Sequence, residues 1–126
     1  MFIAVLAVAL FVLVGLVIDG GRALSETGLA TSDAEQAARL GAGQLSVDGL
    51  RAGVVSVDPV AATTAAQGYL RSVGRSGTVT VSGQTVEVHI EGSEPTAVLS
   101  MIGITRLRIS GTASATNVHG VARSDQ

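Results

Sequence analysis

An uncharged apolar run over Met1–Ile18 constrains the fold of this chain more than any other stretch. The run contains no ionisable side chain and a single glycine, Gly15. As an α-helix rising about 1.5 Å per residue it would extend roughly 27 Å, close to the hydrocarbon thickness of a bilayer at about 30 Å. The first charged side chain, Asp19, follows directly. The sequence therefore predicts a membrane-spanning helix over residues 1–18, with everything after it outside the hydrocarbon.

Two other interpretations fit this run less well. A cleaved signal peptide has a basic start, a shorter apolar stretch and a small-x-small cleavage site, whereas here no basic residue precedes Arg22 and no convincing cleavage site follows. A buried core helix needs large side chains around it, and the chain has two Phe, one Tyr and no Trp. A retained membrane anchor fits the run better than either alternative.

Composition limits what the rest of the chain can do. The formal net charge is −2 and no basic patch is present, which argues against nucleic acid as a partner. Cysteine is absent, which excludes disulfides and thiolate metal sites. The residues after the run suffice for one small domain. Because aromatic residues are only 2% of the chain, a dense independent core is hard to build, which favours a domain stabilised partly by assembly.

Residues 19–45 are predicted to continue the helix as an extension that packs on the globular part. Small side chains recur there at spacings of three and four, as on one face of a helix, and small residues allow helices to approach closely. After Ala30 this stripe favours packing on the chain's own sheet; before Ala30 it favours packing on other chains. The predicted helix-packing interface consists of Gly15, Asp19, Ala23, Thr27, Ala30 and Ala34. Gly20 and Gly21 leave open whether the helix is continuous.

The next segment reads as a connection followed by a second helix. Residues 46–57 contain two glycines and are predicted as a connection. Asp58 and Pro59 form a strong helix start, because Asp can cap and Pro suits the first helical position. The helix is predicted over 59–73 and ends at Gly74. Its expected buried face is Val60, Thr64, Gly68, Tyr69 and Val73.

From residue 77 the apolar period changes from that of a helix to that of a strand. Residues 78–81 and 85–90 alternate around a turn and predict a β-hairpin with its valines facing the core. Residues 91–94 are expected to leave the strand, 95–102 to form a short helix, 105–118 to form a third strand, and 121–126 to be a flexible tail. The chain is thus predicted as an α+β domain over 46–120, in which the long N-terminal helix packs on a small antiparallel three-stranded sheet with two short helices.

Several of these stretches together resemble a known family. The apolar run leading into VIDGGR at 17–22, the AEQAAR segment at 34–39, PTAVL at 95–99 and IGI at 102–104 are similar to the TadE/TadG-like proteins of tight-adherence (Flp) pili, especially the actinobacterial ones. The resemblance implies a pilin-like fold and a membrane-anchored minor subunit or assembly factor of a type IV-related pilus. Its domain would be extracytoplasmic and its partners would be the membrane and other pilin or assembly subunits.

One departure refines that implication. Major Flp pilins carry an acidic residue a few positions into the mature apolar helix, after a glycine-ended leader. Here the first acidic residue is Asp19, and no such leader is visible. The resemblance therefore favours a minor or retained component over a major subunit.

The sequence offers no constellation typical of an enzyme, a cofactor site or a small-molecule site. Glu87, His89 and Glu91 share one face of a predicted strand, but a solvated polar face is expected there in preference to a metal site. A second hypothesis is a monomeric membrane-tethered extracytoplasmic binding module. Its ligand face would lie on Arg106, Arg108, Ser110 and Thr112.

Overall fold

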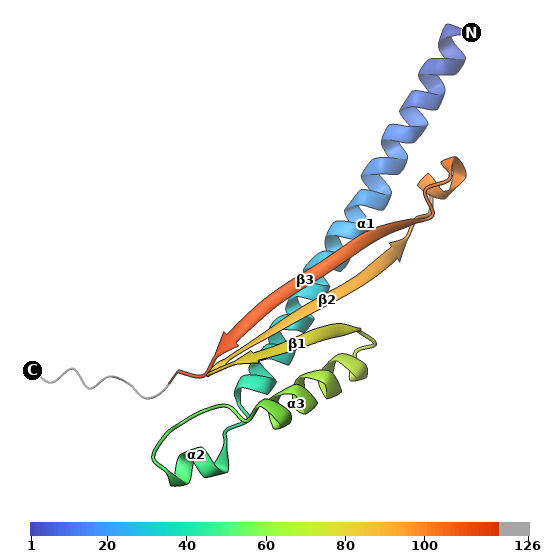
Figure 1. The fold of residues 1–126 in the computed structure, drawn as a ribbon. Helices are drawn as coiled ribbons and strands as arrows, with labels where there is room; N and C mark the ends of the chain where they lie inside the picture. Colours follow the sequence, from blue (N-terminus) through green and yellow to red (C-terminus); the bar gives the residue numbers. More distant parts are fainter. Residues whose placement is uncertain (119–126) are drawn as a thin grey trace, which may run out of the picture.

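The computed structural model describes residues 1–118 and consists of one long helix beside a small antiparallel sheet (Figure 1). Helix α1 (Phe2–Ala42) precedes two shorter helices, α2 (Val47–Arg51) and α3 (Pro59–Ser72). The sheet contains strands β1 (Gly77–Ser82), β2 (Thr85–Pro95) and β3 (Arg106–Thr116), with β2 in the middle. The 3₁₀ turn η1 (Leu99–Ile102) is part of the loop that connects β2 to β3. The predicted α+β class is confirmed. The predicted tail lies outside the described residues.

Helix α1 is continuous through Gly20 and Gly21. Its 41 residues correspond to about 60 Å at 1.5 Å per residue. It ends at Ala42, three residues before the predicted boundary, where the Gly43 amide donates to the Arg39 carbonyl at 3.1 Å and the Gln44 amide to the Gly41 carbonyl at 3.0 Å. The apolar run over residues 1–18 and the predicted extension after it therefore form one continuous helix.

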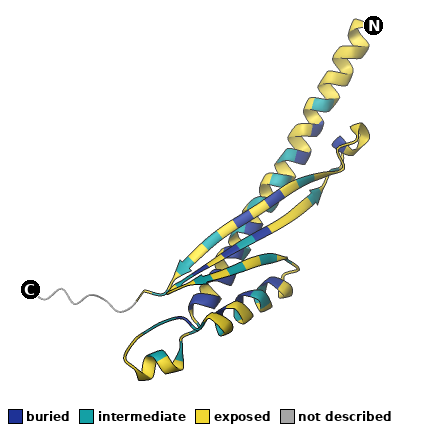
Figure 2. Ribbon diagram, in the orientation of Figure 1, coloured by how far each residue is buried: buried dark blue, intermediate teal, exposed yellow. Residues whose placement is uncertain are grey.

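The two halves of α1 lie in different surroundings (Figure 2). Within residues 2–18 only Gly15 is buried and Val12 half-buried, although nearly every side chain there is large and apolar. In the second half, by contrast, Ala30, Ala34 and Ala37 are fully buried. Among residues 1–118, α1 is the one helix long and apolar enough to cross a membrane.

The second half of α1 covers one face of the sheet, as the sequence predicted. Val86, Val88 and Ile90 of β2 are fully buried beneath it, and every second residue of β2 faces the core there. The approach is closest at β3, where a Cβ built on Gly111 would lie 2.5 Å from Thr31 N. The alanine stripe and this glycine allow helix and strand backbones to meet almost directly.

Helix α3 begins and ends as predicted, but its buried face differs. Asp58 Oδ1 accepts from the amides of Val60 and Ala61 at 3.0 and 3.1 Å, and Gly74 ends the helix with φ of +72°. The prediction that Val60, Thr64, Gly68 and Val73 face the core is wrong, because all four are exposed. The buried residues are Ala62, Ala66 and Leu70.

The short distance between α1 and α3 determines which residues of α3 are buried. A Cβ on Gly41 of α1 would lie 3.2 Å from the Ala62 carbonyl oxygen, so the two backbones nearly touch. Alanine fits such a contact and valine does not, because its branched side chain holds the helices apart. Val60 accordingly lies on the outside, 77% exposed.

Strand β2 extends beyond its predicted end at residue 90, and the connection before α3 contains a helix that the sequence did not predict. Residues 91–94 stay in β2, and pairing continues to Pro95 opposite Arg106, because cross-strand hydrogen bonds outweigh weak local strand preference. The helix predicted over 95–102 shortens to η1, which Gly103 closes with φ of +93°. The missed helix, α2, begins where Ser46 Oγ accepts from the Gly49 amide at 3.1 Å.

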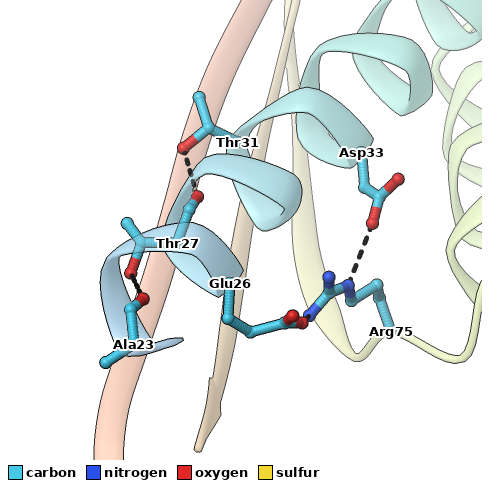
Figure 3. A network of polar contacts seen from close by, with 6 residues as sticks. All are labelled: Ala23, Glu26, Thr27, Thr31, Asp33 and Arg75. Atoms are coloured by element: carbon cyan, nitrogen blue, oxygen red, sulfur yellow. Dashed lines mark hydrogen bonds and ion pairs between the residues drawn. The ribbon is translucent and has the colours of Figure 1, made fainter. Parts of the chain in front are cut away.

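A polar tie joins α1 to the segment between α3 and β1 (Figure 3). Arg75 Nε donates to Asp33 Oδ2 at 3.0 Å, and Arg75 Nη1 pairs with Glu26 Oε1. The two carboxylates are seven residues apart on α1 and so share one face. The Arg75 side chain is only 16% exposed, which limits solvent screening of the pairs.

We expect Arg75→Ala to destabilise the fold by about 1–3 kcal/mol, because it leaves two partly buried carboxylates without their donor. Arg71→Ala, on the exposed side of α3, is the matched control and should change stability by less than about 0.5 kcal/mol. Thermal unfolding of the full chain in detergent, followed by circular dichroism, measures both. Equal melting temperatures for the two variants would show that the tie contributes nothing.

Candidate functional site

The candidate site is the junction between the apolar half of α1 and the β2–β3 loop, and Asp19 lies at its centre. This is the only charged side chain buried among residues 1–118, at 1% exposure. Its Oδ1 accepts from the Ala97 amide at 2.9 Å, and its Oδ2 from the amides of Val98 and Leu99 at 3.0 and 2.7 Å. One carboxylate therefore fixes a loop about 80 residues away along the chain to the end of the apolar run.

These hydrogen bonds also set the charge state of the carboxyl. The amides of Leu99 and Ala97 have the largest effect and hold the pKa of Asp19 below its ordinary value of 3.8; burial opposes them, and the Val98 amide and the charge of Arg22 add to them. Hydrogen bonds donated to a carboxylate favour its ionised form. Asp19 thus remains a carboxylate at neutral pH despite being covered.

Apolar contacts complete the junction on the other side of Asp19. A Cβ on Gly15 would lie 2.6 Å from Val98 Cγ1 and 3.5 Å from Leu99 Cδ2. Leu99 is 3% exposed. The missing side chain at Gly15 thus lets the loop lie against α1 within the apolar run. A shallow apolar depression there is lined by Val8, Phe11, Val12, Val98, Leu99, Met101 and Ile102.

The predicted helix-packing residues all lie on the face of α1 that is turned toward the chain's own domain. Gly15 and Asp19 hold the β2–β3 loop, and Ala23 packs against the core cluster. The Thr27 hydroxyl donates to the Ala23 carbonyl at 2.8 Å (Figure 3). Ala30 and Ala34 lie fully buried in the same core. This stripe therefore has partners within the chain, including the part before Ala30 that was predicted to pack on other chains.

The strand face that carries His89 is polar and internally hydrogen-bonded. His89 Nδ1 lies 2.6 Å from Thr112 Oγ1, and Nε2 lies 3.2 Å from Glu91 Oε1. Glu87 is exposed on the same face. Over residues 1–118 no group of three or more His, Asp or Glu side chains is placed to hold a metal ion.

The role of Asp19 at the site, and the Arg75 ion pairs elsewhere on α1, were not found from sequence. Asp19 was assigned to a packing stripe, whereas it acts as an acceptor for three amides. The available signal was an acidic residue at the end of an uncharged run. The partners of Asp19 are backbone amides, and these cannot be identified from the sequence. The partners of Arg75 are side chains, but the sequence does not show that they lie within hydrogen-bond distance.

Comparison with protein-family models, with curated proteins and with solved structures gives no match to this chain.

Proposed function

We propose that this protein is a membrane-anchored, pilin-like minor subunit or assembly factor of a tight-adherence pilus. The observation that supports the proposal is that the two halves of α1 lie in different surroundings. One uninterrupted α1 has an exposed apolar half and a half built into an α+β domain. The sequence resemblance to TadE/TadG-like proteins supports the same function, and it supports an extracytoplasmic position for the domain.

The chemistry of α1 suits a subunit that passes from lipid into an assembly. A helix satisfies its own backbone hydrogen bonds, so lipid can solvate its apolar side chains before assembly. Other helices can replace the lipid afterwards without loss of burial. The domain stays folded throughout, because its core is on the other half of α1.

Contacts with other subunits are proposed on the uncovered face of α1 just beyond the anchor. Leu24 is 76% exposed there. Gly21 and Gly28 lie one turn before and after it, and a Cβ at either position would meet nothing within 4 Å. A second helix can therefore approach this face closely around an apolar side chain.

We expect Leu24→Glu to abolish association with pilus subunits while membrane insertion is retained. The readout is site-specific photo-crosslinking from position 28 in native membranes, with a fall in crosslinked product of about tenfold or more, as for a charge forced into an apolar contact. Ser25→Glu, exposed on the next position of the helix, is the control and should crosslink as the parent does. If Leu24→Glu crosslinks as efficiently as Ser25→Glu, this face is not an interface.

A tethered binding module is the second candidate, and the outer face of the sheet favours it. Arg106, Arg108 and Ser110 are exposed there, and a shallow depression includes His89, Glu91 and Arg108. A chain lacking residues 1–14 keeps Gly15 and Asp19 and separates the candidates. Cosedimentation of this shortened chain with isolated cell wall would favour the binder, whereas loss of all association would favour the pilus subunit.

A further inference from the structure

The tip of the β2–β3 hairpin is an uncharged apolar surface next to the anchor. Residues 95–105 contain no ionisable side chain, and the charged residues Glu94 and Arg106 flank them on either side. Met101 is 85% exposed, Ile102 53% and Ile104 44%. Side chains of this size on a loop that faced water would be solvated unfavourably.

The tip lies alongside the part of α1 that is proposed to be in the membrane (Figures 1 and 2). Val98 contacts Gly15, and Met101 and Ile102 share a depression with Val8 and Phe11. Along a helix, Gly15 and Phe11 are about 6 and 12 Å from Asp19. A bilayer that covers Met1–Ile18 therefore also covers this tip.

The backbone of the tip is suited to a medium without water. Asp19 accepts from the amides of Ala97, Val98 and Leu99. Within the loop, the amide of Met101 donates to the Val98 carbonyl at 3.1 Å and that of Ile104 to the Leu99 carbonyl at 3.1 Å.

Two hydroxyls of the loop, those of Ser100 and Thr96, are also paired internally. Ser100 Oγ donates to the Ala97 carbonyl at 2.9 Å, and Thr96 Oγ1 donates to the Ile104 carbonyl. Irregular backbone enters hydrocarbon only when its polar groups are satisfied within the protein, and these contacts pair many of the polar groups of the tip.

We propose that the β2–β3 tip, Pro95–Thr105, inserts Met101, Ile102 and Ile104 among the acyl chains of the lipid leaflet nearest the domain. The tip is then a second membrane contact beside α1, and Asp19 joins the two. The proposal rests on the membrane anchoring proposed above. Lipid is chosen over a second protein chain because the apolar surface of the tip continues that of the anchor at the same depth.

The test is depth-dependent quenching in liposomes of phosphatidylcholine and phosphatidylglycerol with brominated acyl chains. Because the chain has no cysteine, Met101→Cys can carry a single NBD label on the full-length protein. Phe11→Cys marks the anchor, and Ser82→Cys marks the opposite end of the sheet. We expect the label at position 101 to be quenched almost as strongly as at position 11, and several-fold more than at position 82.

The outcomes separate the two claims. If position 11 is quenched and position 101 behaves as position 82, the tip is outside the lipid and this inference fails while the anchor stands. A label at 101 that is shielded from water but not quenched by brominated lipid would indicate a second protein chain, and would also overturn it. If position 11 is not quenched, membrane anchoring itself fails.

Discussion

Gly111→Ala should destabilise the domain by about 3 kcal/mol or more, at the upper end of the range for overpacked cores. The added Cβ would lie 2.5 Å from Thr31 N and 2.6 Å from Ala30 C. Both are backbone atoms in the middle of α1, so no side-chain rotation relieves the clash. Strand β3 and α1 would have to separate, which would uncover Ile109 and Ala34. Thermal unfolding of the full chain in detergent, followed by circular dichroism, measures the loss.

Gly28→Ala is the matched control, because a Cβ there meets nothing within 4 Å. It replaces a glycine inside the same helix and should stabilise the protein by up to about 1 kcal/mol. If Gly111→Ala unfolds at the same temperature as the parent, α1 and β3 do not approach as closely as described, and the alanine stripe needs another explanation.

Asp19→Ala should release the β2–β3 loop from α1. Three amides lose their acceptor at once, and hydrogen exchange at Ala97, Val98 and Leu99 should become about tenfold faster or more. Asp48→Ala is the control, since the Asp48 side chain is 97% exposed and the loop should exchange as in the parent. Hydrogen-exchange mass spectrometry on peptides that cover residues 96–104 gives the answer.

The same contact predicts a specific dependence on pH. The folded pKa of Asp19 is lowered from its ordinary 3.8 by hydrogen bonds from Leu99 and Ala97. The stability that this carboxylate contributes is therefore fully present above the unfolded pKa and is lost only as the pH falls through the lower folded pKa. Protection of the loop should be constant from neutral pH down to about pH 5. Asp19→Asn should lack the acid-induced loss, and an identical acid profile in that variant would contradict the assignment.

Much of the fold followed from two periodicities in the sequence. The alternation over 78–81 and 85–90 identified the buried valines of the hairpin, and the alanine spacing after Ala30 identified the part of α1 that covers them. The start of α3 was predicted because capping by Asp58 is a local interaction. These features depend on neighbours in sequence, which is why a single chain reveals them.

The features that were missed depend on groups far apart in sequence. The extension of β2 to Pro95 comes from pairing with β3, and the buried face of α3 comes from its distance to Gly41. For the candidate site, Gly15 and Asp19 were predicted to belong to a helix-packing interface with other chains, whereas both contact the chain's own β2–β3 loop. Their contacts with the β2–β3 loop could not be predicted, because the sequence does not show which distant backbone amides meet Asp19 or which loop lies against Gly15.

The exposed half of α1 is proposed to lie in a membrane while its other half supports the domain. Alkaline carbonate extraction of membranes that contain the full chain tests this most directly, with a chain lacking residues 1–14 as the control. The full chain should remain in the membrane pellet, and the shortened chain should be released. Recovery of the full chain in the carbonate supernatant, together with the shortened one, would contradict the account.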